Sequence, residues 1–148
     1  MSVTFLGPLS EGGTRLPFIS LSSAGSQSPV VERHLSIAQV CDVREPHAYL
    51  ARVESESMQR VGMCTGDMLV VDRSRYAEHG DVVVASLNSR QLCRRLHMRG
   101  DVVILTSENS AYPPLHVTDH DDLIILGVVT HNVKSLDKHQ AHNGPERR

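Results

Sequence analysis

The chain has 148 residues, enough for one compact domain with additional residues at either end. Hydrophobic residues make up 40% of it, aromatic residues only 3%, and tryptophan is absent, so leucine, valine, isoleucine and methionine must build the core. The formal net charge of -2 excludes a general electrostatic attraction to nucleic acid or anionic membranes, and we expect no direct DNA binding.

The cysteines and the apolar runs exclude further classes of protein. Cys41, Cys64 and Cys93 are too widely spaced for a CxxC zinc motif, and their odd number argues against a disulfide framework. No apolar run reaches membrane-spanning length, and the first residues lack the pattern of a secretory signal. We therefore expect a soluble, cytoplasmic protein with no membrane attachment.

The N-terminal part has two predicted sections. Residues 1–29 are rich in Gly, Ser and Pro, which predicts a flexible arm. Residues 29–40 predict a short helix, since Pro29 fits the first turn. The apolar side of this helix would carry Val31, His34, Leu35 and Ala38.

From about residue 49 the pattern changes to short apolar runs separated by turn signals such as Arg99-Gly100-Asp101. The predicted strands cover residues 49–53, 67–72, 81–87, 91–98, 102–106 and 123–133. Such closely spaced strands predict a compact, mostly β domain over residues 30–134. The polar residues 135–148 predict a disordered C-terminal tail.

The predicted strand over residues 91–98 carries a charge on its apolar face. Alternation places Arg94 on the same face as Leu92 and Leu96. A buried charge without a partner costs several kcal/mol. Two interpretations therefore stand: Arg94 lies near the domain edge and extends its charged end to water, or it faces a polar site.

Five short segments of the chain form a recognisable series. They are Ser57-Met58, 66–72, 79–85, 109–113 and 127–131. Each is weak alone, but their order and spacing resemble the peptidase domain of the LexA/UmuD superfamily of self-cleaving serine peptidases, and UmuD most closely. The resemblance extends over residues 24–134 and implies a fold of short, strongly bent strands with one short N-terminal helix.

The resemblance also implies a reaction. In this family the serine of the Ser-Met pair is the nucleophile, a buried neutral lysine on a later strand is its base, and backbone N–H groups near the nucleophile stabilise the oxyanion. Ser57 matches the nucleophile. The family cuts its own chain at a small-residue–Gly bond, which Ala24-Gly25 matches, about thirty residues before Ser57. Cleavage there would leave the shorter, active form that UmuD proteins use.

The sequence departs from the family at the base, because Arg94 stands at the lysine position and the next residue is Arg95. A lysine needs roughly 4–5 kcal/mol to become neutral at pH 7, which burial can supply, whereas an arginine needs roughly 9 kcal/mol. Arg94 would therefore orient Ser57 or bind an oxyanion, but would not deprotonate it. The only lysines are C-terminal, and Lys134 matches a non-catalytic position while Lys138 lies beyond it.

A second departure precedes the nucleophile. The family's Ser-Gly-Asp-Ser-Met is Glu-Ser-Glu-Ser-Met at residues 54–58. Ser55 replaces a glycine, so any tight backbone geometry at this position is in question. Two carboxylates are also introduced: either Glu54 or Glu56 neutralises Arg94, or both are solvated surface residues.

Three functions compete. The first is a self-cleaving peptidase triggered by a RecA filament on single-stranded DNA. The second, which we favour, is a UmuD-like SOS mutagenesis subunit with weakened or lost self-cleavage that binds a UmuC-type translesion polymerase. The third is the peptidase part of a LexA-type repressor, which the few residues before Ala24 disfavour. The resemblance implies a homodimer. We expect no cofactor, and no metal, because the histidines lack a ligand spacing.

Overall fold

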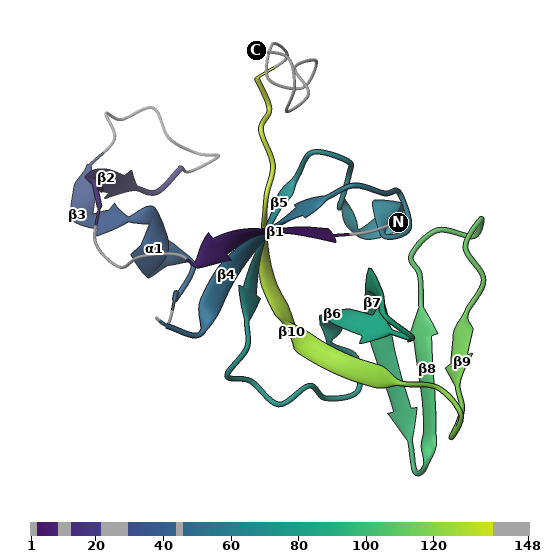
Figure 1. Cartoon of the computed structure of the whole chain (residues 1–148). Helices are drawn as coiled ribbons and strands as arrows, with labels where there is room; N and C mark the ends of the chain where they lie inside the picture. Colours follow the sequence, from purple (N-terminus) through teal and green to yellow (C-terminus); the bar gives the residue numbers. More distant parts are fainter. Residues whose placement is uncertain (1–2, 9–12, 22–29, 44–45, 138–148) are drawn as a thin grey trace.

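The computed structural model describes residues 3–8, 13–21, 30–43 and 46–137, and it confirms a mostly β fold (Figure 1). The large sheet contains β1 (Val3–Pro8), β4 (Ala48–Val53), β5 (Met68–Asp72), β6 (Val82–Leu87), β7 (Arg90–Arg99), β8 (Val102–Thr106), β9 (Leu115–Val117) and β10 (Leu123–Val133). A separate hairpin contains β2 (Arg15–Ile19) and β3 (Val31–Ser36). The helical segments are α1 (Ile37–Val40) and a single 3-10 turn, η1 (Gln59–Val61).

The large sheet is antiparallel at every pairing, in the order β1-β4-β5-β10-β6-β7-β8-β9. β10 joins its two halves, since its first residues pair with β6 and its last residues with β5, with a register shift in each pairing. Figure 1 shows the resulting curve of β10 between the two groups of strands. Bulges of this kind bend a strand and increase its twist.

The core is built mainly from aliphatic side chains, with methionine, as the composition predicts. Successive residues of β6 point to opposite faces of the sheet, and both faces are covered: Val84 joins one buried cluster and Val83 another. Leu92 and Leu96 of β7 pack in the same cluster, as alternation predicts, while Cys93 packs in the other. Because both faces of β6 are covered, most of its residues are apolar, whereas β7 carries charged residues among its buried apolar ones.

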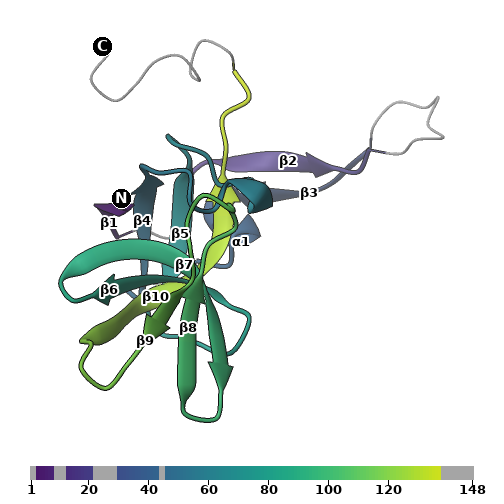
Figure 2. The same ribbon diagram turned by 90° about the vertical axis from the view of Figure 1, so that its right-hand side faces the viewer.

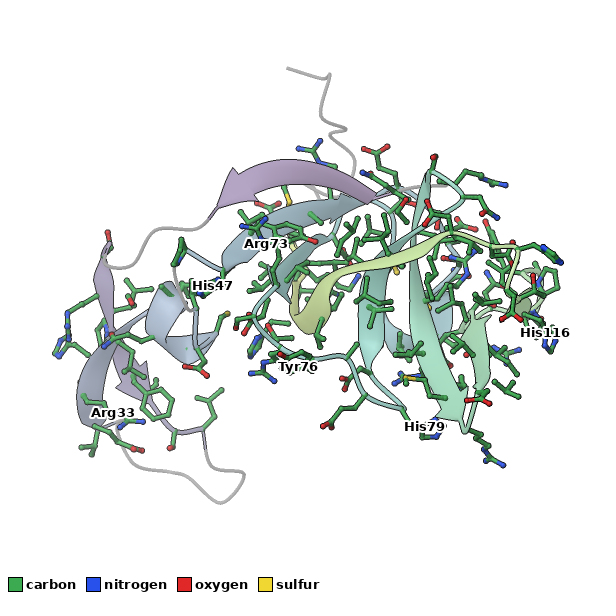
Figure 3. The ribbon with its side chains drawn as sticks, turned by 60° about the horizontal axis from the view of Figure 1, so that its bottom comes forward. Arg33, His47, Arg73, Tyr76, His79 and His116 are labelled. Atoms are coloured by element: carbon green, nitrogen blue, oxygen red, sulfur yellow. The ribbon has the colours of Figure 1, made fainter. Side chains whose placement is uncertain are left out.

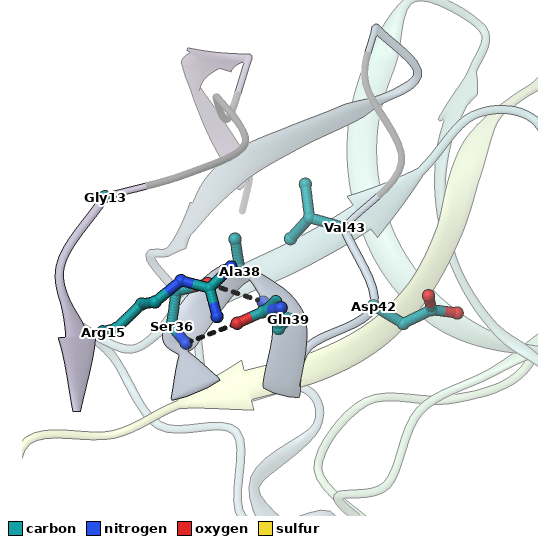
Figure 4. Close-up of a pocket in the computed structure, with 7 residues that line it drawn as sticks. All are labelled: Gly13, Arg15, Ser36, Ala38, Gln39, Asp42 and Val43. Atoms are coloured by element: carbon teal, nitrogen blue, oxygen red, sulfur yellow. Dashed lines mark hydrogen bonds between the residues drawn. The ribbon is translucent and has the colours of Figure 1, made fainter. Parts of the chain in front are cut away.

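The helix predicted over residues 29–40 is wrong for most of its length. Residues 31–36 are strand β3, which pairs with β2, and only Ile37–Val40 is helical. Ser36 explains the boundary, because it forms a capping box with Gln39: Gln39 N donates to Ser36 Oγ at 3.1 Å, and Ser36 N donates to Gln39 Oε1 at 2.9 Å (Figure 4). Long-range pairing thus overrides the helical pattern before this cap.

The prediction of a flexible arm over residues 1–29 did not foresee β1 and β2. β1 extends the large sheet by pairing with β4, and β2 pairs with β3 in a hairpin that extends away from the large sheet (Figure 2). The side chains of β2 are largely exposed, because a two-stranded hairpin has no second layer to cover them. The sequence of β2 therefore lacks the alternation of apolar and polar residues that predicts a half-buried strand. Residues 138–148 lie outside the described part of the chain.

The described part of the chain has no helix that is long and apolar enough to cross a membrane.

Candidate functional site

Ser57 lies in the loop between β4 and β5, directly before η1. Two backbone hydrogen bonds close the base of this loop, from Gly66 N to Val53 O at 2.8 Å and from Val53 N to Asp67 O at 2.9 Å. The Met58 side chain is buried in the core beside β4 and β5. Ser57 itself is only 2% exposed. The fold therefore fixes the backbone on both sides of Ser57.

A second loop, over residues 107–112 between β8 and β9, is fastened to the Ser57 loop. Glu108 N donates to Ser57 O at 2.8 Å, and Arg60 N donates to Glu108 O at 2.9 Å. The Asn109 side-chain amide donates to Glu56 O at 2.8 Å. These three bonds join two loops that are far apart in sequence around Ser57.

Arg94 comes to Ser57 from β7. Its Nη1 donates to Ser57 Oγ at 2.9 Å and to Cys93 O at 2.9 Å, and its guanidinium carbon lies 5.6 Å from the centroid of the Tyr112 ring. Arg94 is only 7% exposed. Of the two interpretations of this residue, the one in which it faces a polar site is therefore correct, and the one in which it extends to water is wrong.

The guanidinium of Arg94 is a donor without an accessible lone pair, so in this contact Ser57 Oγ is the acceptor. Burial lowers the pKa of Arg94 from its ordinary value, the direction expected for a charge removed from water. The ion pairs within the described residues do not include Arg94, and its Nε is buried without a hydrogen-bond partner. Neither Glu54 nor Glu56 forms an ion pair with Arg94 among the described residues, so the hypothesis that one of them neutralises Arg94 is wrong.

Ser55 contacts Ser57, and the sequence did not predict this contact. Its Oγ lies 3.1 Å from Ser57 Oγ and accepts a hydrogen bond from Ser57 N at 3.2 Å. The described non-glycine residues with positive φ are Asp42, Asn88 and Ser89, so Ser55 has an ordinary backbone conformation. Ser55 at the family's glycine position thus needs no left-handed backbone, and it places a hydroxyl against Ser57, the candidate nucleophile.

Arg95 has a different role from Arg94. Its Nε lies 2.8 Å from Glu108 Oε2, and its Nη1 donates to Gly80 O at 2.6 Å. Arg95 thus ties the second loop to the turn before β6 and does not contact Ser57. Its side chain points to the opposite face of β7 from that of Arg94, as the alternation predicts.

Lys134 is not placed to replace the missing base. Its Nζ lies 2.6 Å from Asp67 Oδ2, which also accepts hydrogen bonds from Cys64 N and Asn132 Nδ2. The hydrogen bond to Asp67 raises the pKa of Lys134, whereas a lysine base needs a lowered pKa. Lys138 lies outside the described residues.

The proposed cleavage site, Ala24-Gly25, also lies outside the described residues. The strands before and after it in sequence, β2 and β3, are paired as an antiparallel hairpin (Figure 2).

Among the histidines of the described chain, His79 and His97 are in edge-to-face contact, with their ring centroids 5.3 Å apart. Figure 3 shows His47, His79 and His116 on separate parts of the ribbon. Within the residues that the structure describes, no group of three or more His, Cys, Asp or Glu side chains is arranged to hold a metal ion.

Comparison with known proteins identifies the family of the chain. The Peptidase S24-like family matches residues 17–130. The LexA repressor of Syntrophotalea carbinolica is 35% identical over 125 residues, which are 81% of this chain and 60% of the repressor. Protein MucA of Escherichia coli is 35% identical over 133 residues, 84% of this chain and 90% of MucA. Protein ImpA of Salmonella typhimurium is 30% identical over 138 residues, 88% of this chain and 94% of ImpA.

The chain thus spans less than two thirds of the LexA repressor but nearly all of MucA and ImpA. It belongs to the Peptidase S24-like family, as a UmuD-like member of the LexA/UmuD superfamily.

Proposed function

We propose that this chain is a UmuD-like SOS mutagenesis protein, an accessory to an error-prone translesion polymerase, in which RecA-stimulated self-cleavage at Ala24-Gly25 is weakened or lost. One observation carries the proposal: the residue in contact with the nucleophile, 2.9 Å from Ser57 Oγ, is the guanidinium of Arg94. The near full-length similarity to MucA and ImpA supports a UmuD-like role over that of a repressor.

The chemistry of self-cleavage explains why this contact matters. Ser57 Oγ must lose its proton as it bonds to the carbonyl carbon of residue 24, and the amine of residue 25 must gain one as the C–N bond breaks. Water then hydrolyses the resulting ester and frees Ser57. A neutral lysine can take the first proton and deliver the second. Arg94 can do neither at neutral pH, because it stays protonated. Loss of a general base typically lowers a rate by about 10²–10⁴-fold.

The first alternative is an active self-cleaving peptidase triggered by a RecA filament on single-stranded DNA. It is favoured by the preserved contact between positions 57 and 94, since the residues still meet as a nucleophile and its partner would. The second alternative, the peptidase part of a LexA-type repressor, rests on a match that covers only 60% of that repressor.

The test is incubation of the full chain with RecA, nucleotide and single-stranded DNA, followed by mass measurement. We expect the unaltered chain to stay intact and the Arg94→Lys variant to release a fragment that begins at Gly25. Arg95→Lys is the matched control, because it alters the neighbouring arginine that contacts Glu108 and not Ser57. A fragment beginning at Gly25 from the unaltered chain, absent in Ser57→Ala, would contradict the proposal.

The proposed partners are a second copy of the chain and a UmuC-type polymerase. Direct contact with DNA and attachment to membranes are not part of the proposal, in keeping with the net charge of -2.

A further inference from the structure

Two departures of this sequence from its family meet at one atom. Arg94, at the lysine position, donates to Ser57 Oγ at 2.9 Å. Ser55, at the glycine position, has its own Oγ 3.1 Å from the same Ser57 Oγ. Arg94 reaches Ser57 from β7, 37 residues further along the chain, whereas Ser55 lies two residues before Ser57 in the same loop, so the fold brings a remote departure onto a local one.

We propose that Ser55 is a positioning residue that holds Ser57 in a resting arrangement and restrains cleavage separately from Arg94. The inference rests on the proposed function, because it concerns the same weakened site. It implies that restoring a lysine at position 94 recovers only part of the cleavage rate, and that the remainder depends on the hydroxyl of Ser55.

Either hydroxyl of the Ser55–Ser57 pair could be the donor, and both arrangements support this role. If the Ser57 hydroxyl donates to Ser55, its proton points away from position 94, where a base would collect it. If the Ser55 hydroxyl donates instead, Ser57 Oγ accepts from both Ser55 and Arg94, and both of its lone pairs are engaged. In the first arrangement Ser57 must break its contact with Ser55 before its proton can reach a base at position 94, and in the second it must give up one of its two accepted hydrogen bonds before it can attack a carbonyl.

The backbone N–H of Ser57 is engaged as well, since it donates to Ser55 Oγ at 3.2 Å. Backbone N–H groups at a nucleophile are the usual donors to the oxyanion of acyl transfer, and losing one such donor costs about 10²–10³-fold in rate. While this bond persists, Ser57 N–H is not available to an oxyanion. A single hydroxyl thus occupies both the nucleophile and a potential oxyanion donor.

The experiment compares self-cleavage in three full-length variants under RecA, nucleotide and single-stranded DNA. They are Arg94→Lys alone and Arg94→Lys combined with either Ser55→Ala or Ser55→Thr. Ser55→Ala removes the hydroxyl, and Ser55→Thr retains it. The cleavage rate is measured as a function of pH, and its value at the high-pH plateau is compared between variants. We expect this plateau rate to be at least about tenfold higher in Arg94→Lys with Ser55→Ala than in Arg94→Lys alone, which corresponds to a barrier lower by roughly 1.4 kcal/mol. Ser55→Thr should leave the rate close to that of Arg94→Lys.

A second readout does not need cleavage. The rate at which a small fluorophosphonate forms an adduct with Ser57, read by intact mass with Ser57→Ala as the blank, should rise in Ser55→Ala and not in Ser55→Thr. Equal behaviour of the alanine and threonine variants in both readouts, including no reaction in either, overturns the inference. Cleavage of the unaltered chain would instead contradict the proposed function. The cleavage rates of Ser55→Ala and Ser55→Thr, both with Arg94 intact, would then decide the role of Ser55.

Discussion

At the scale of single residues, Arg94 carries a buried positive charge with few compensating contacts. It donates to one hydroxyl and one carbonyl, faces the Tyr112 ring, and leaves Nε without a partner. Desolvating a charge costs several kcal/mol, and replacing buried charges by apolar residues of similar volume is often neutral or stabilising. Arg94 is therefore better explained by its position at Ser57 than by a contribution to stability.

The Arg94→Met variant tests this explanation. We expect its free energy of unfolding, measured by urea denaturation, to be equal to that of the unaltered chain or higher by about 1–2 kcal/mol. Arg95→Met is the comparison, because it removes the contacts to Glu108 and Gly80 O and should lower the free energy by about 1–2 kcal/mol. A larger loss in Arg94→Met than in Arg95→Met would show that Arg94 is chiefly structural.

The sequence predicts part of this site and not the rest. The Ser-Met pair and the strand motifs identify Ser57, and alternation along β7 places Arg94 on the face of Leu92 and Leu96. The direction of a side chain in a loop has no such periodicity. For this reason the engagement of Ser55 with Ser57 was not predicted, and the expected pairing of Arg94 with Glu54 or Glu56 was wrong.

At the scale of elements, Gly127 allows β10 to pass close to β5. A Cβ at this position would lie 2.5 Å from Val71 Cγ1 and 3.2 Å from the carbonyl oxygen of Asp72. Contacts this short require the neighbouring atoms to shift, and Val71 is fully buried. The bend that joins the two halves of the large sheet thus depends on the absence of a side chain at residue 127.

The Gly127→Ala variant should lower the free energy of unfolding by about 1–3 kcal/mol through overpacking, measured by urea denaturation. The double variant Gly127→Ala with Val71→Ala should show less than the sum of the two single losses, because truncating Val71 removes the closest atom. Additive losses would contradict this steric explanation.

The strands that were predicted from the sequence are all in the interior of the large sheet, each paired on both sides. The runs at 102–106 and 123–133 match β8 and β10, because β-branched and aliphatic residues dominate both strands. Strands β1, β2, β3 and β9 were missed, β3 because it was predicted as part of a helix. β9 has only three residues, and β2 is exposed and interrupted by Pro17, so their pairing partners define them more than their composition does.

At the scale of the whole molecule, exposed apolar side chains gather near α1. Ile37 is 60% exposed, and it lines an apolar pocket together with Leu16 and Val133, from the hairpin and the end of β10. Contiguous exposed apolar surface of this kind is typical of protein–protein contacts. It supports the proposed homodimer.

The Ile37→Asp variant should weaken the proposed homodimer, because a carboxylate would have to be buried in the interface. Light scattering after size exclusion should give the mass of a dimer for the unaltered chain and a shift toward the monomer mass for Ile37→Asp. Val102→Asp on β8 is the control, since Val102 is similarly exposed, at 55%. A monomeric unaltered chain, or equal masses for both variants, would contradict this assignment.

The most direct test of the central claim, that Arg94 cannot act as the base for Ser57, is the rate of self-cleavage against pH. The unaltered chain and Arg94→Lys would be followed by intact mass between about pH 7 and 10.5, which spans the ordinary lysine pKa of about 10.4. Because an amine becomes a base only on losing its proton, the rate of Arg94→Lys should rise with pH and then level off. The unaltered chain should stay uncut throughout, and a Ser57-dependent rise in its rate parallel to that of Arg94→Lys would contradict the account.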